Sequence, residues 1–577
     1  NPYLCGVQGF CCTDNLVFLM IGSYFRPKLL DVFSGYNRER FMADLMAGVI
    51  VGIVALPLAI AFGIASGVSP ETGLITAIID GFIVSLLGGS SVQIGGPTGA
   101  FIVIVYGIIH KYGIEGLTIA TIIAGILLLV MGVLRLGTLI KFIPYPIVVG
   151  FTAGIALTIF STQMNDLFGL GITDMPGDFL GKWGAYFTNF KSVNLWAFGM
   201  GLLSIVIIML SPRFTKKIPG SLIAIILMTV AAYLLRLQGI GEFETIGDRF
   251  TISAQLPKPT GVTLSLETIR QLFPPAFTIA LLGAIESLLS ASVADGVIGE
   301  KHNSNTELIA QGAANIVVPF FGGIPVTGAI ARTMTNINNG GRSPIAGIIH
   351  AFVLLLILLF LGPLTAYIPM ACLAGVLIIV SYNMSGWRSV ANIGRGPRSD
   401  SLVMLVTFLL TVILDLTVAI EIGLLLAILL FMKRVTENTR ITVATGRLDL
   451  TQTGEIAHHD EVLDIPKGVE VYEIEGPFFF GIANRFEEIM NTLGDHPDVR
   501  IIRMRHVPFM DSTGMHNLEN LIKMSRKEGV SIVLSGVRKD VHEELATAGI
   551  VELLGEENVC ADIQAALRQA QAIAQGA

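Results

Sequence analysis

Charged side chains are scarce in this sequence. Asp, Glu, Lys and Arg make up 14% of its 577 residues, whereas a soluble domain usually carries about 25%. Hydrophobic residues make up 53% of the chain, and the mean hydropathy is +0.71. This balance excludes an ordinary soluble protein and indicates an integral membrane protein with several spans. The formal net charge is only −7, so no nucleic-acid partner is expected.

Cysteine is also sparse, and its five positions show no spacing that resembles a zinc site. Cys5, Cys11 and Cys12 lie near the start of the chain, Cys372 lies in an apolar segment, and Cys560 lies in the polar tail. This pattern does not suggest a disulfide scaffold. No nucleophile stands with a base or a metal cluster, so neither an enzyme nor a bound cofactor is expected.

Long apolar segments fill most of the first 434 residues. A helix needs about 20 residues to cross a bilayer. Two series of seven apolar segments stand on either side of a polar stretch at 238–265. We predict membrane helices near residues 42–64, 71–88, 97–110, 116–137, 144–168, 193–212 and 219–237, and then near 274–294, 304–321, 326–337, 344–363, 366–382, 400–418 and 419–433.

The two series are expected to form inverted repeats. An odd number of spans in each half turns the second half over relative to the first, as transporters of this design require. The spacing supports the pairing, because Pro57 lies 40 residues before Pro97 and Glu286 lies 39 residues before Pro325. The expected parts are a cytoplasmic N-terminal region (1–40), a first membrane repeat (41–237), an extracytoplasmic connection (238–273), a second membrane repeat (274–434), and a linker with a cytoplasmic domain (435–577).

Basic residues give the orientation. By the positive-inside rule, the loops that are rich in Lys and Arg face the cytoplasm. These loops contain Arg135, Lys141, Arg213, Lys216, Lys217, Lys301, Arg342, Arg388, Arg395, Arg398, Lys433 and Arg434. The opposite loops carry fewer, among them Lys111, Lys182, Lys191, Arg249 and Lys258. The N-terminus and the tail are therefore expected in the cytoplasm.

A short phrase rich in Gly and Pro occurs in each half, as Gly95-Gly-Pro-Thr-Gly-Ala100 and as Gly322-Gly-Ile-Pro-Val-Thr-Gly-Ala329. Inside a bilayer such backbone is tolerated only where it is buried in protein or lines a wet cavity, and matching interruptions in two repeats point to a binding site. Helices that start there would aim N–H groups and positive dipole ends at an anion. The candidate substrate-binding residues are Thr98, Gly99, Ala100, Thr327 and Gly328. The alternative is close helix packing through small residues.

Two charged residues lie inside the second series. Arg332, five residues after Thr327, is costly in a membrane unless it faces a cavity or a partner. It is a candidate for drawing the anion to the helix ends. The alternative is a structural ion pair, with Glu286 as the expected partner. Burial disfavours the charged form of a carboxyl, so Glu286 is in turn a candidate proton carrier.

Phe62 follows Pro57 in the first predicted helix. A proline in mid-membrane removes a hydrogen bond and kinks the helix. The edge of an aromatic ring carries partial positive charge, which makes Phe62 a candidate for lining an anion cavity. Ordinary packing of the ring is the alternative.

The composition changes after residue 434. Strand-like alternation occurs over Val469–Glu475, Val499–Arg505 and Val530–Ser535, with helical patterns at 482–493, 513–527, 539–547 and 560–573. Strands that alternate with helices indicate a small α/β domain. In that tail, Asp511-Ser-Thr-Gly514 follows a strand and opens a helix. Ser512 is therefore a candidate site of phosphorylation or phosphate binding, and simple helix capping is the alternative.

The chain resembles the SulP sulfate-permease family of anion transporters, which includes prestin, from about residue 38 to residue 570. The matching stretches are Ala55–Phe62, Gly96–Thr98, Ala284–Ser287, Asn303–Glu307 and Ala329–Arg332. The tail is similar to the STAS domain of that family, with Asp511–Gly514 as its loop signature. The resemblance implies 14 spans in two inverted repeats, divided into core and gate domains, a dimer, and an elevator-like movement of the core.

The resemblance also implies an anion held between the third and tenth helices, with Phe62, Thr98 and Arg332 at substrate-site positions. Prestin-like members have a hydroxyl where this chain has Ala331. Sodium-coupled bicarbonate members have an acid at the position of Glu286 and a hydroxyl near Ser290, but a guanidinium such as that of Arg332 would repel sodium. The chain therefore looks more like the proton-coupled bacterial members that carry C4-dicarboxylates or sulfate.

We therefore predict an α-helical polytopic membrane protein with a small cytoplasmic α/β STAS domain. Its expected function is secondary active transport of C4-dicarboxylates or sulfate, with the proton as coupling ion and with Glu286 and Ser290 as coupling residues. The alternatives are a sodium-coupled bicarbonate transporter, a passive anion exchanger or channel, and a membrane-tethered signalling protein. The expected partners are the anion, the lipid bilayer, a second copy of the chain, and a cytoplasmic protein bound through the STAS domain.

Overall fold

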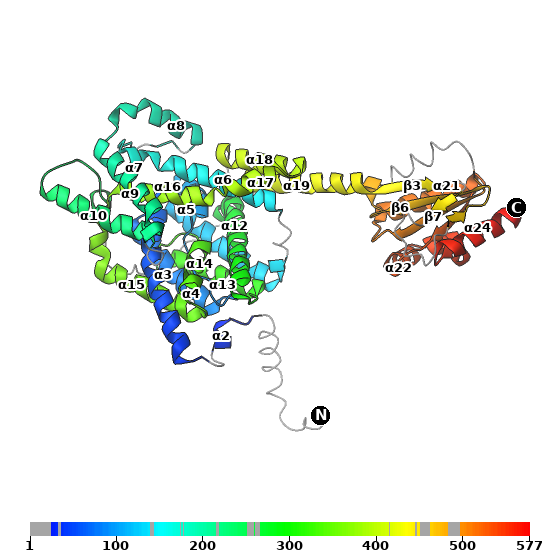
Figure 1. Ribbon diagram of the computed structural model, residues 1–577, viewed down its shortest axis with the longest axis horizontal. Coiled ribbons are helices and arrows are strands. Elements are labelled where there is room, and N and C mark those ends of the chain that lie inside the picture. Colours follow the sequence, from blue (N-terminus) through cyan, green and yellow to red (C-terminus); the bar gives the residue numbers. More distant parts are fainter. Residues whose placement is uncertain are drawn as a thin grey trace, which may run out of the picture. The chain divides into compact units, whose positions relative to one another are not determined.

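The computed structural model in Figure 1 describes residues 25–32, 36–138, 144–172, 175–176, 178–214, 219–250, 259, 266–414, 416–444, 447–449, 462–482 and 497–576. Some residues discussed above lie outside this set, namely Cys5, Cys11, Cys12, Lys141, Lys216, Lys217 and Lys258. So does the helix expected over 482–493, apart from its first residue. The chain divides into two compact units, Asn1–Ala427 and Ile428–Ala577, and each is described by itself.

The first unit consists mainly of helices. Its first part contains α2 (Leu29–Val32), α3 (Arg38–Ala65), α4 (Pro70–Leu87), α5 (Gly99–Val133), α6 (Tyr145–Thr162), α7 (Met164–Phe168), α8 (Phe179–Thr188), η2 (Phe190–Ser192), α9 (Leu195–Phe214), α10 (Gly220–Leu237) and α11 (Ile246–Arg249). Its second part contains α12 (Leu266–Ile298), α13 (Ser304–Val317), η3 (Val318–Phe321), α14 (Ile330–Asn338), α15 (Pro344–Thr365), α16 (Met370–Met384), α17 (Trp387–Gly394), α18 (Arg398–Ile413) and α19 (Leu416–Asn438), which ends in the second unit. Within the described residues, nine helical segments are long and apolar enough to cross a membrane.

Each apolar segment predicted from the sequence coincides with a helix or with part of one. The break expected between the segments 97–110 and 116–137 is present, because α5 consists of two helical parts that meet at a kink at Gly113. Gly113 has a φ of 72° and a ψ of −176°, a conformation that glycine reaches at little cost. The sequence analysis missed α8 and α17, because helices of 10 and 8 residues are too short for their apolar period to stand out from a loop. The number of membrane crossings stays a prediction.

The membrane helices pack mainly within two groups (Figure 1). The core group is α3, α4, α5, α12, α13, α14 and α15, and the gate group is α6, α7, α9, α10, α16 and α18. Small residues allow helices to approach closely in a bilayer. A Cβ added at Gly125 of α5 would lie 2.8 Å from the carbonyl oxygen of Gly312 in α13, and one added at Gly150 of α6 would lie 2.5 Å from that of Met404 in α18. Glycine therefore fixes major contacts inside both groups.

The second unit is a five-stranded sheet with helices on both faces. Its strands lie in the order β3 (Arg440–Ala444), β6 (Val469–Glu475), β7 (Val499–His506), β8 (Ser531–Ser535) and β9 (Val559–Cys560). β3 is antiparallel to β6, and the other pairs are parallel. The remaining elements are a two-stranded sheet of β4 (Arg447–Asp449) and β5 (Val462–Asp464), and the helices α21 (Ser512–Lys527), α22 (Lys539–Thr547), α23 (Ile550–Leu554), η4 (Glu556–Asn558) and α24 (Ile563–Gly576).

Alternation along the strands builds the two faces of this sheet, because successive side chains of a strand point to opposite sides. In β8, Ile532 and Leu534 belong to the apolar cluster that includes α21, α22 and α23, whereas Val533 belongs to the cluster that includes α24. The α/β fold predicted for the tail is confirmed, with strands at the three positions expected from the sequence.

Candidate functional site

The two Gly/Pro phrases meet in the middle of the core group. Gly95–Gly96 forms β1 and Thr327–Gly328 forms β2, and the two pair in antiparallel fashion, with Gly95 opposite Gly328 and Gly96 opposite Thr327. Helix α5 begins at Gly99, just after β1, and helix α14 begins at Ile330, just after β2. The structure therefore brings together the starts of two helices that are far apart in the sequence.

The start of α5 is left uncapped. Thr98 occupies the N-cap position with extended backbone angles, φ −125° and ψ 158°, but its side chain makes no capping hydrogen bond. The first N–H groups of a helix have no acceptor within the helix, and they carry the positive end of its dipole. The Thr98 hydroxyl is buried, and its oxygen has no hydrogen-bond partner among the described residues. The turn thus offers donors that suit a small anion.

Arg332 ties α14 to the first phrase. Its side chain is 1% exposed, and its Nη1 and Nη2 donate to the carbonyl oxygens of Gly95 and Pro97 at 3.1 and 2.5 Å. No ion pair joins Arg332 to Glu286 among the residues that the structure describes. The guanidinium therefore lies inside the core group, where it satisfies the interrupted backbone of β1. Its positive charge lies behind the start of α5.

Other polar side chains of α14 also hold the first phrase. The Oγ1 atom of Thr333 accepts from the N–H of Ile94 at 3.1 Å, and Nδ2 of Asn336 donates to the carbonyl oxygen of Val92 at 2.9 Å. Together with Arg332, these residues lie on one face of the helix, because positions three and four apart share a face. Non-helical backbone at membrane depth needs such partners, so this face of α14 makes the break before α5 possible.

The second phrase is held in a similar way by α13. The side-chain amide of Asn315 accepts from the N–H of Val326 at 3.0 Å and donates to its carbonyl oxygen at 2.9 Å. The Thr327 hydroxyl donates to the carbonyl oxygen of Gly283 in α12 at 2.8 Å. The two matching threonines therefore differ, since the hydroxyl of Thr327 has a hydrogen-bond partner and that of Thr98 has none among the residues that the structure describes.

Gly95 and Gly96 lie between two buried charged side chains. The carboxylate of Asp80, on α4, packs against Gly95, and the guanidinium of Arg332 packs against Gly96. A Cβ at either glycine would overlap these groups. Asp80 is fully buried, and opposite charges on the two sides of β1 partly balance each other at this depth. Gly96 also has a φ of 149°, which non-glycine residues rarely adopt.

Glu286 and Ser290 lie on the face of α12 that borders this site. Ser290 is buried, and its hydroxyl lies 3.3 Å from Oγ1 of Thr333 in α14. Glu286 stands four residues before Ser290 and three after Gly283, so these positions share a helix face. Its side chain is partly exposed and makes no hydrogen bond or ion pair among the described residues.

The gate group covers the start of α5. A Cβ at Gly99 would lie 3.6 Å from Cε1 of Phe62 on α3, 3.4 Å from Sδ of Met384 on α16, and 3.4 Å from Cδ1 of Ile159 on α6. Phe62 therefore lies beside the turn, and its role in anion binding stays a prediction. The turn lies at the boundary between the core group and the gate group.

The remaining candidate residues, Ala100, Gly328 and Ala331, differ in their surroundings. Ala100 is fully buried, and Gly328 packs against the side chain of Gln93. Ala331 is exposed, which places it on a face of α14 other than that of Arg332.

The sequence analysis did not single out the role of Glu307, a fully buried acid of α13. Its carboxylate accepts from the N–H of Gly89 at 2.9 Å, from Nε2 of Gln93 at 3.0 Å and from Nε2 of Gln311 at 3.1 Å. The hydroxyl of Ser287 lies 3.3 Å away. Glu307 thus links α12, α13 and the segment before β1. An acid inside a predicted membrane segment was the available signal.

In the second unit, Ser512 is exposed at the start of α21. The capping residue is its neighbour Asp511, whose carboxylate accepts from the N–H of Gly514 at 2.7 Å. Ser512 lies at a groove of about 690 Å³ between α21 and α22 that is also lined by Glu519, Asp540 and Glu543. Its role in regulation stays a prediction.

One cluster of the second unit has the residue types of a metal site, namely Glu473, Glu475 and His506. Glu473 is buried and accepts from Arg503 and Arg505, both at 3.2 Å. Two guanidinium groups already compensate this carboxylate, and their charge disfavours a metal cation. These residues are therefore better explained as an ion-pair network of the sheet.

Comparisons with known proteins cover both units. The family model described as the sulfate permease family matches residues 41–407, and that of the STAS domain matches residues 462–566. YvdB of Bacillus subtilis (strain 168), named as a candidate sulfate transporter, is 40% identical over 535 residues, which are 91% of this chain and 97% of its own. The bicarbonate transporter BicA of Picosynechococcus sp. is 30% identical over 82% of this chain and 85% of its own. A solved structure of murine Slc26a9 shares the fold, with a TM-score of 0.84 at 18% identity over 98% of this chain and 96% of that one.

Proposed function

The chain belongs to the sulfate permease family of anion transporters, and we propose that it carries a divalent oxyanion, sulfate or a C4-dicarboxylate, together with a proton. It is a multi-pass membrane transporter with a C-terminal STAS domain, and not an enzyme. We place it in the plasma membrane as a dimer, with the N-terminus and the STAS domain in the cytoplasm.

The observation that carries this proposal is the pairing of β1 with β2 at the starts of α5 and α14. Two helix starts supply N–H donors and partial positive charge without a fixed ionic group. The unpartnered Thr98 hydroxyl adds a donor, and the buried charge of Arg332 lies behind it. The anion is bound between these helix starts, with Phe62 at its side. The core group then moves against the gate group to carry the site across the bilayer.

Glu286 is the proposed proton carrier. Its side chain is partly exposed beside the site and has no charged partner among the described residues. A carboxyl in this position is neutral once it binds a proton, and it then adds no charge to the moving group. An anion that travels with a proton brings less net charge into the low-dielectric part of the membrane.

Glu286→Gln is expected to abolish proton-driven accumulation, because glutamine keeps the size of the side chain but does not titrate. The measurement is uptake of labelled sulfate and of labelled fumarate into proteoliposomes, with and without an inward proton gradient. Glu267→Gln is the matched control, since Glu267 lies on the same helix and is exposed. Full gradient-driven uptake by Glu286→Gln would remove Glu286 from the mechanism.

A sodium-coupled bicarbonate transporter is the second candidate function. The 30% identity to the bicarbonate transporter of Picosynechococcus sp. favours it. Against it, the guanidinium of Arg332 lies in the same helix as Thr333, the residue that Ser290 contacts, and a fixed cation disfavours sodium nearby. The same proteoliposomes decide between the two, with labelled bicarbonate and a sodium gradient as the second arm. Uptake that follows sodium and ignores the proton gradient would overturn the proton coupling proposed here.

A further inference from the structure

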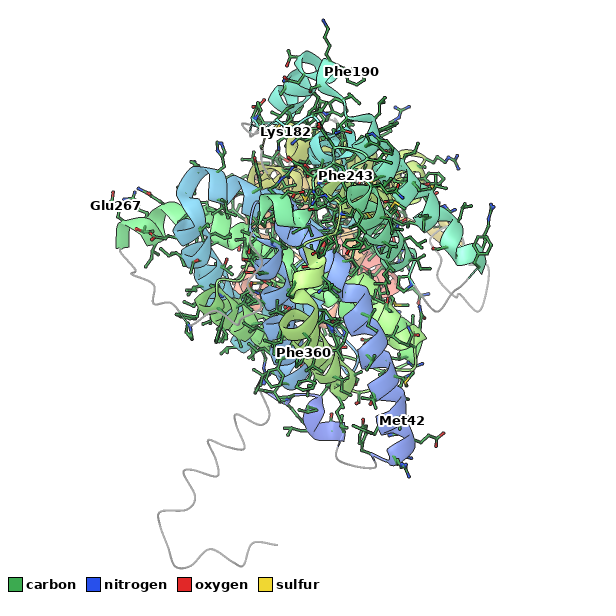
Figure 2. The ribbon with its side chains drawn as sticks, turned by 90° about the vertical axis from the view of Figure 1, so that its left-hand side faces the viewer. Met42, Lys182, Phe190, Phe243, Glu267 and Phe360 are labelled. Atoms are coloured by element: carbon green, nitrogen blue, oxygen red, sulfur yellow. The ribbon has the colours of Figure 1, made fainter. Side chains whose placement is uncertain are left out.

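A cavity of about 200 Å³ lies between the core group and the gate group. Its lining includes Ala61 and Tyr106 from the core group, Gln163 and Asp166 at the end of α6 and in α7, Lys182 of α8, and Arg249 of α11. Figure 2 shows Lys182 and Phe243 toward the end of the first unit opposite Met42. On the orientation proposed above, this end faces the outside of the cell.

Lys182 is a buried cation that belongs to the gate side of this cavity. The residue is 4% exposed, and it forms no ion pair among the residues that the structure describes. Its ammonium lies 5.0 Å from the ring centroid of Tyr106 in α5, a cation–π contact. Helix α8 is fixed to α6, because Tyr186 donates to the carbonyl oxygen of Ser161 at 2.8 Å and Trp183 donates to its hydroxyl at 3.1 Å.

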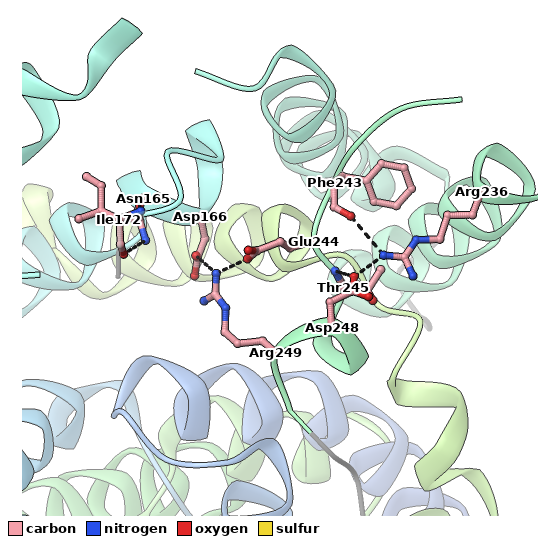
Figure 3. A network of polar contacts seen from close by, with 9 residues as sticks. All are labelled: Asn165, Asp166, Ile172, Arg236, Phe243, Glu244, Thr245, Asp248 and Arg249. Carbon is pink, nitrogen blue, oxygen red and sulfur yellow. Dashed lines mark hydrogen bonds and ion pairs between the residues drawn. The ribbon is translucent and has the colours of Figure 1, made fainter. Parts of the chain in front are cut away.

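Arg249, the other cation of the cavity, is already paired. Its guanidinium donates to Asp166 at 3.0 Å and to Glu244 at 2.5 Å (Figure 3). The backbone of Glu244 is in turn bonded to the start of α16, where its carbonyl oxygen accepts from the N–H of Met370 at 3.0 Å. Arg249 is thus held by two acids, and Lys182 is the cation of the cavity that has no ion-pair partner among the described residues.

The cavity is lined by two of the helices that also form the transport site, α3 and α5. Tyr106 lies seven residues after Gly99, which is about 10 Å along a helix. On the α3 side, Ala61 lines the cavity and is the neighbour of Phe62, which packs beside Gly99. An anion beside Tyr106 would therefore lie about two helical turns along α5 from its uncapped start.

We propose that this cavity is a second, outer anion site, in which Lys182 exchanges its contact with the Tyr106 ring for a small oxyanion group, a carboxylate or sulfate, arriving from outside. An oxyanion accepts charge-assisted hydrogen bonds from an ammonium, which a ring face cannot match. The side-chain amide of Gln163 lines the same cavity. The inference rests on the proposed function and names a receiving site that precedes the site at Thr98.

The test compares the two sides of the membrane with one variant, Lys182→Gln. Uptake of labelled sulfate and, in a parallel experiment, of labelled fumarate is measured in two preparations. In intact cells the outer face of the protein meets the labelled anion, and in inverted membrane vesicles the cytoplasmic face does. For Lys182→Gln we expect the KM for uptake from the outer side to rise about fivefold or more and kcat to stay unchanged, because a full charge near the anion is lost. The KM from inside should stay unchanged. A response of only one anion would identify the oxyanion that the site receives.

Two control variants make the result specific. Lys182→Arg keeps the charge and should bring the outside KM back to within about twofold of the unchanged protein. Lys191→Gln removes an exposed lysine close to α8 and should have no effect. An outside KM unchanged in Lys182→Gln, or one that rises equally from both sides, would overturn the proposal.

Chemical protection separates this inference from the proposed transport function. In the purified full-length protein, sulfate should slow acylation of Lys182 by an amine-reactive reagent and leave that of Lys191 unchanged, with both rates measured by mass spectrometry. Protection would support the outer site even if neither sulfate nor fumarate were taken up. Failed uptake would overturn only the proposed transport function. Absence of protection by sulfate and by fumarate would overturn the outer site even if both anions were transported.

The outer site also predicts a dependence on external pH. Burial lowers the pKa of the Lys182 ammonium, and Asp178 opposes this shift. The other titratable groups around it are Tyr106, Asp166, Tyr186 and Arg249. Because the charged form is lost as pH rises through a lowered pKa, outside affinity should fall at a less alkaline pH than for an ordinary lysine. In Lys182→Arg this fall should move to higher pH, and an unmoved profile would contradict the role of Lys182.

Discussion

Replacement of Arg332 with alanine is expected to abolish anion uptake and to lower the stability of the membrane unit. The alanine variant leaves the carbonyl oxygens of Gly95 and Pro97 without their donors. It also leaves Asp80 buried without the opposite charge on the other side of β1. A hydrogen bond to a charged group contributes about 1.5–3 kcal/mol, and two are lost here. Thermal unfolding in detergent and uptake into proteoliposomes measure the two effects.

The lysine variant separates charge from geometry. Arg332→Lys keeps a positive charge, but a compact ammonium cannot bond two carbonyl oxygens in the way that a planar guanidinium does. We expect a loss of about 1–3 kcal/mol for the unmet acceptor and uptake reduced about tenfold or more. Arg395→Lys is the control, because Arg395 is exposed at the end of α17 and its side chain makes no hydrogen bond or ion pair among the described residues. If the Arg332→Ala protein had an unchanged melting temperature and unchanged uptake, the bonds from this guanidinium to Gly95 and Pro97 would not be needed for stability or transport.

Gly96→Ala is expected to have an effect of similar size. The φ of 149° at this position is unfavourable for alanine, and the added Cβ would overlap the guanidinium of Arg332. Backbone strain and overpacking together should cost about 3 kcal/mol or more, and β1 would have to separate from β2. The expected result is loss of uptake with a lowered melting temperature.

The control for Gly96→Ala is Gly113→Ala. Gly113 also has a positive φ, 72°, but a Cβ there meets nothing within 4 Å. Its substitution should cost only backbone strain, about 1–3 kcal/mol, with uptake largely kept. If Gly96→Ala and Gly113→Ala lowered the melting temperature and uptake equally, the close contact between Gly96 and Arg332 would not be important for the site.

Much of the fold could be predicted from the sequence, because the signals for its elements are local. Apolar segments locate the helices of the first unit, and period-2 alternation locates the strands of the second. Even the meeting of the two phrases follows from their matching places in the two repeats. The short helix α8 carries no such signal, and with it the sequence analysis missed the burial of Lys182 against Tyr106.

The direction of side chains within the site was harder to predict. Arg332 bonds a carbonyl oxygen 237 residues away, and its rotation about α14 depends on the register between two segments that no local pattern fixes. For the same reason the sequence could not show that the Thr327 hydroxyl has a partner, whereas that of Thr98 has none within the described part of the chain. Phe62 was a candidate both from its place after Pro57 and from the resemblance to a family, and its contact with the anion stays a prediction.

The most direct test of the central claim, that the anion binds at the uncapped start of α5, is the sulfate and fumarate affinity of Thr98→Val and Thr327→Val, measured by calorimetry on purified protein. Valine keeps the shape of threonine and removes the hydroxyl. Thr98→Val should weaken binding about tenfold or more, because a hydrogen bond to a charged group is lost, with the melting temperature kept. Thr327→Val should lower the melting temperature and leave the affinity unchanged. Binding of both anions to Thr98→Val at the affinity of the unchanged protein would contradict the account.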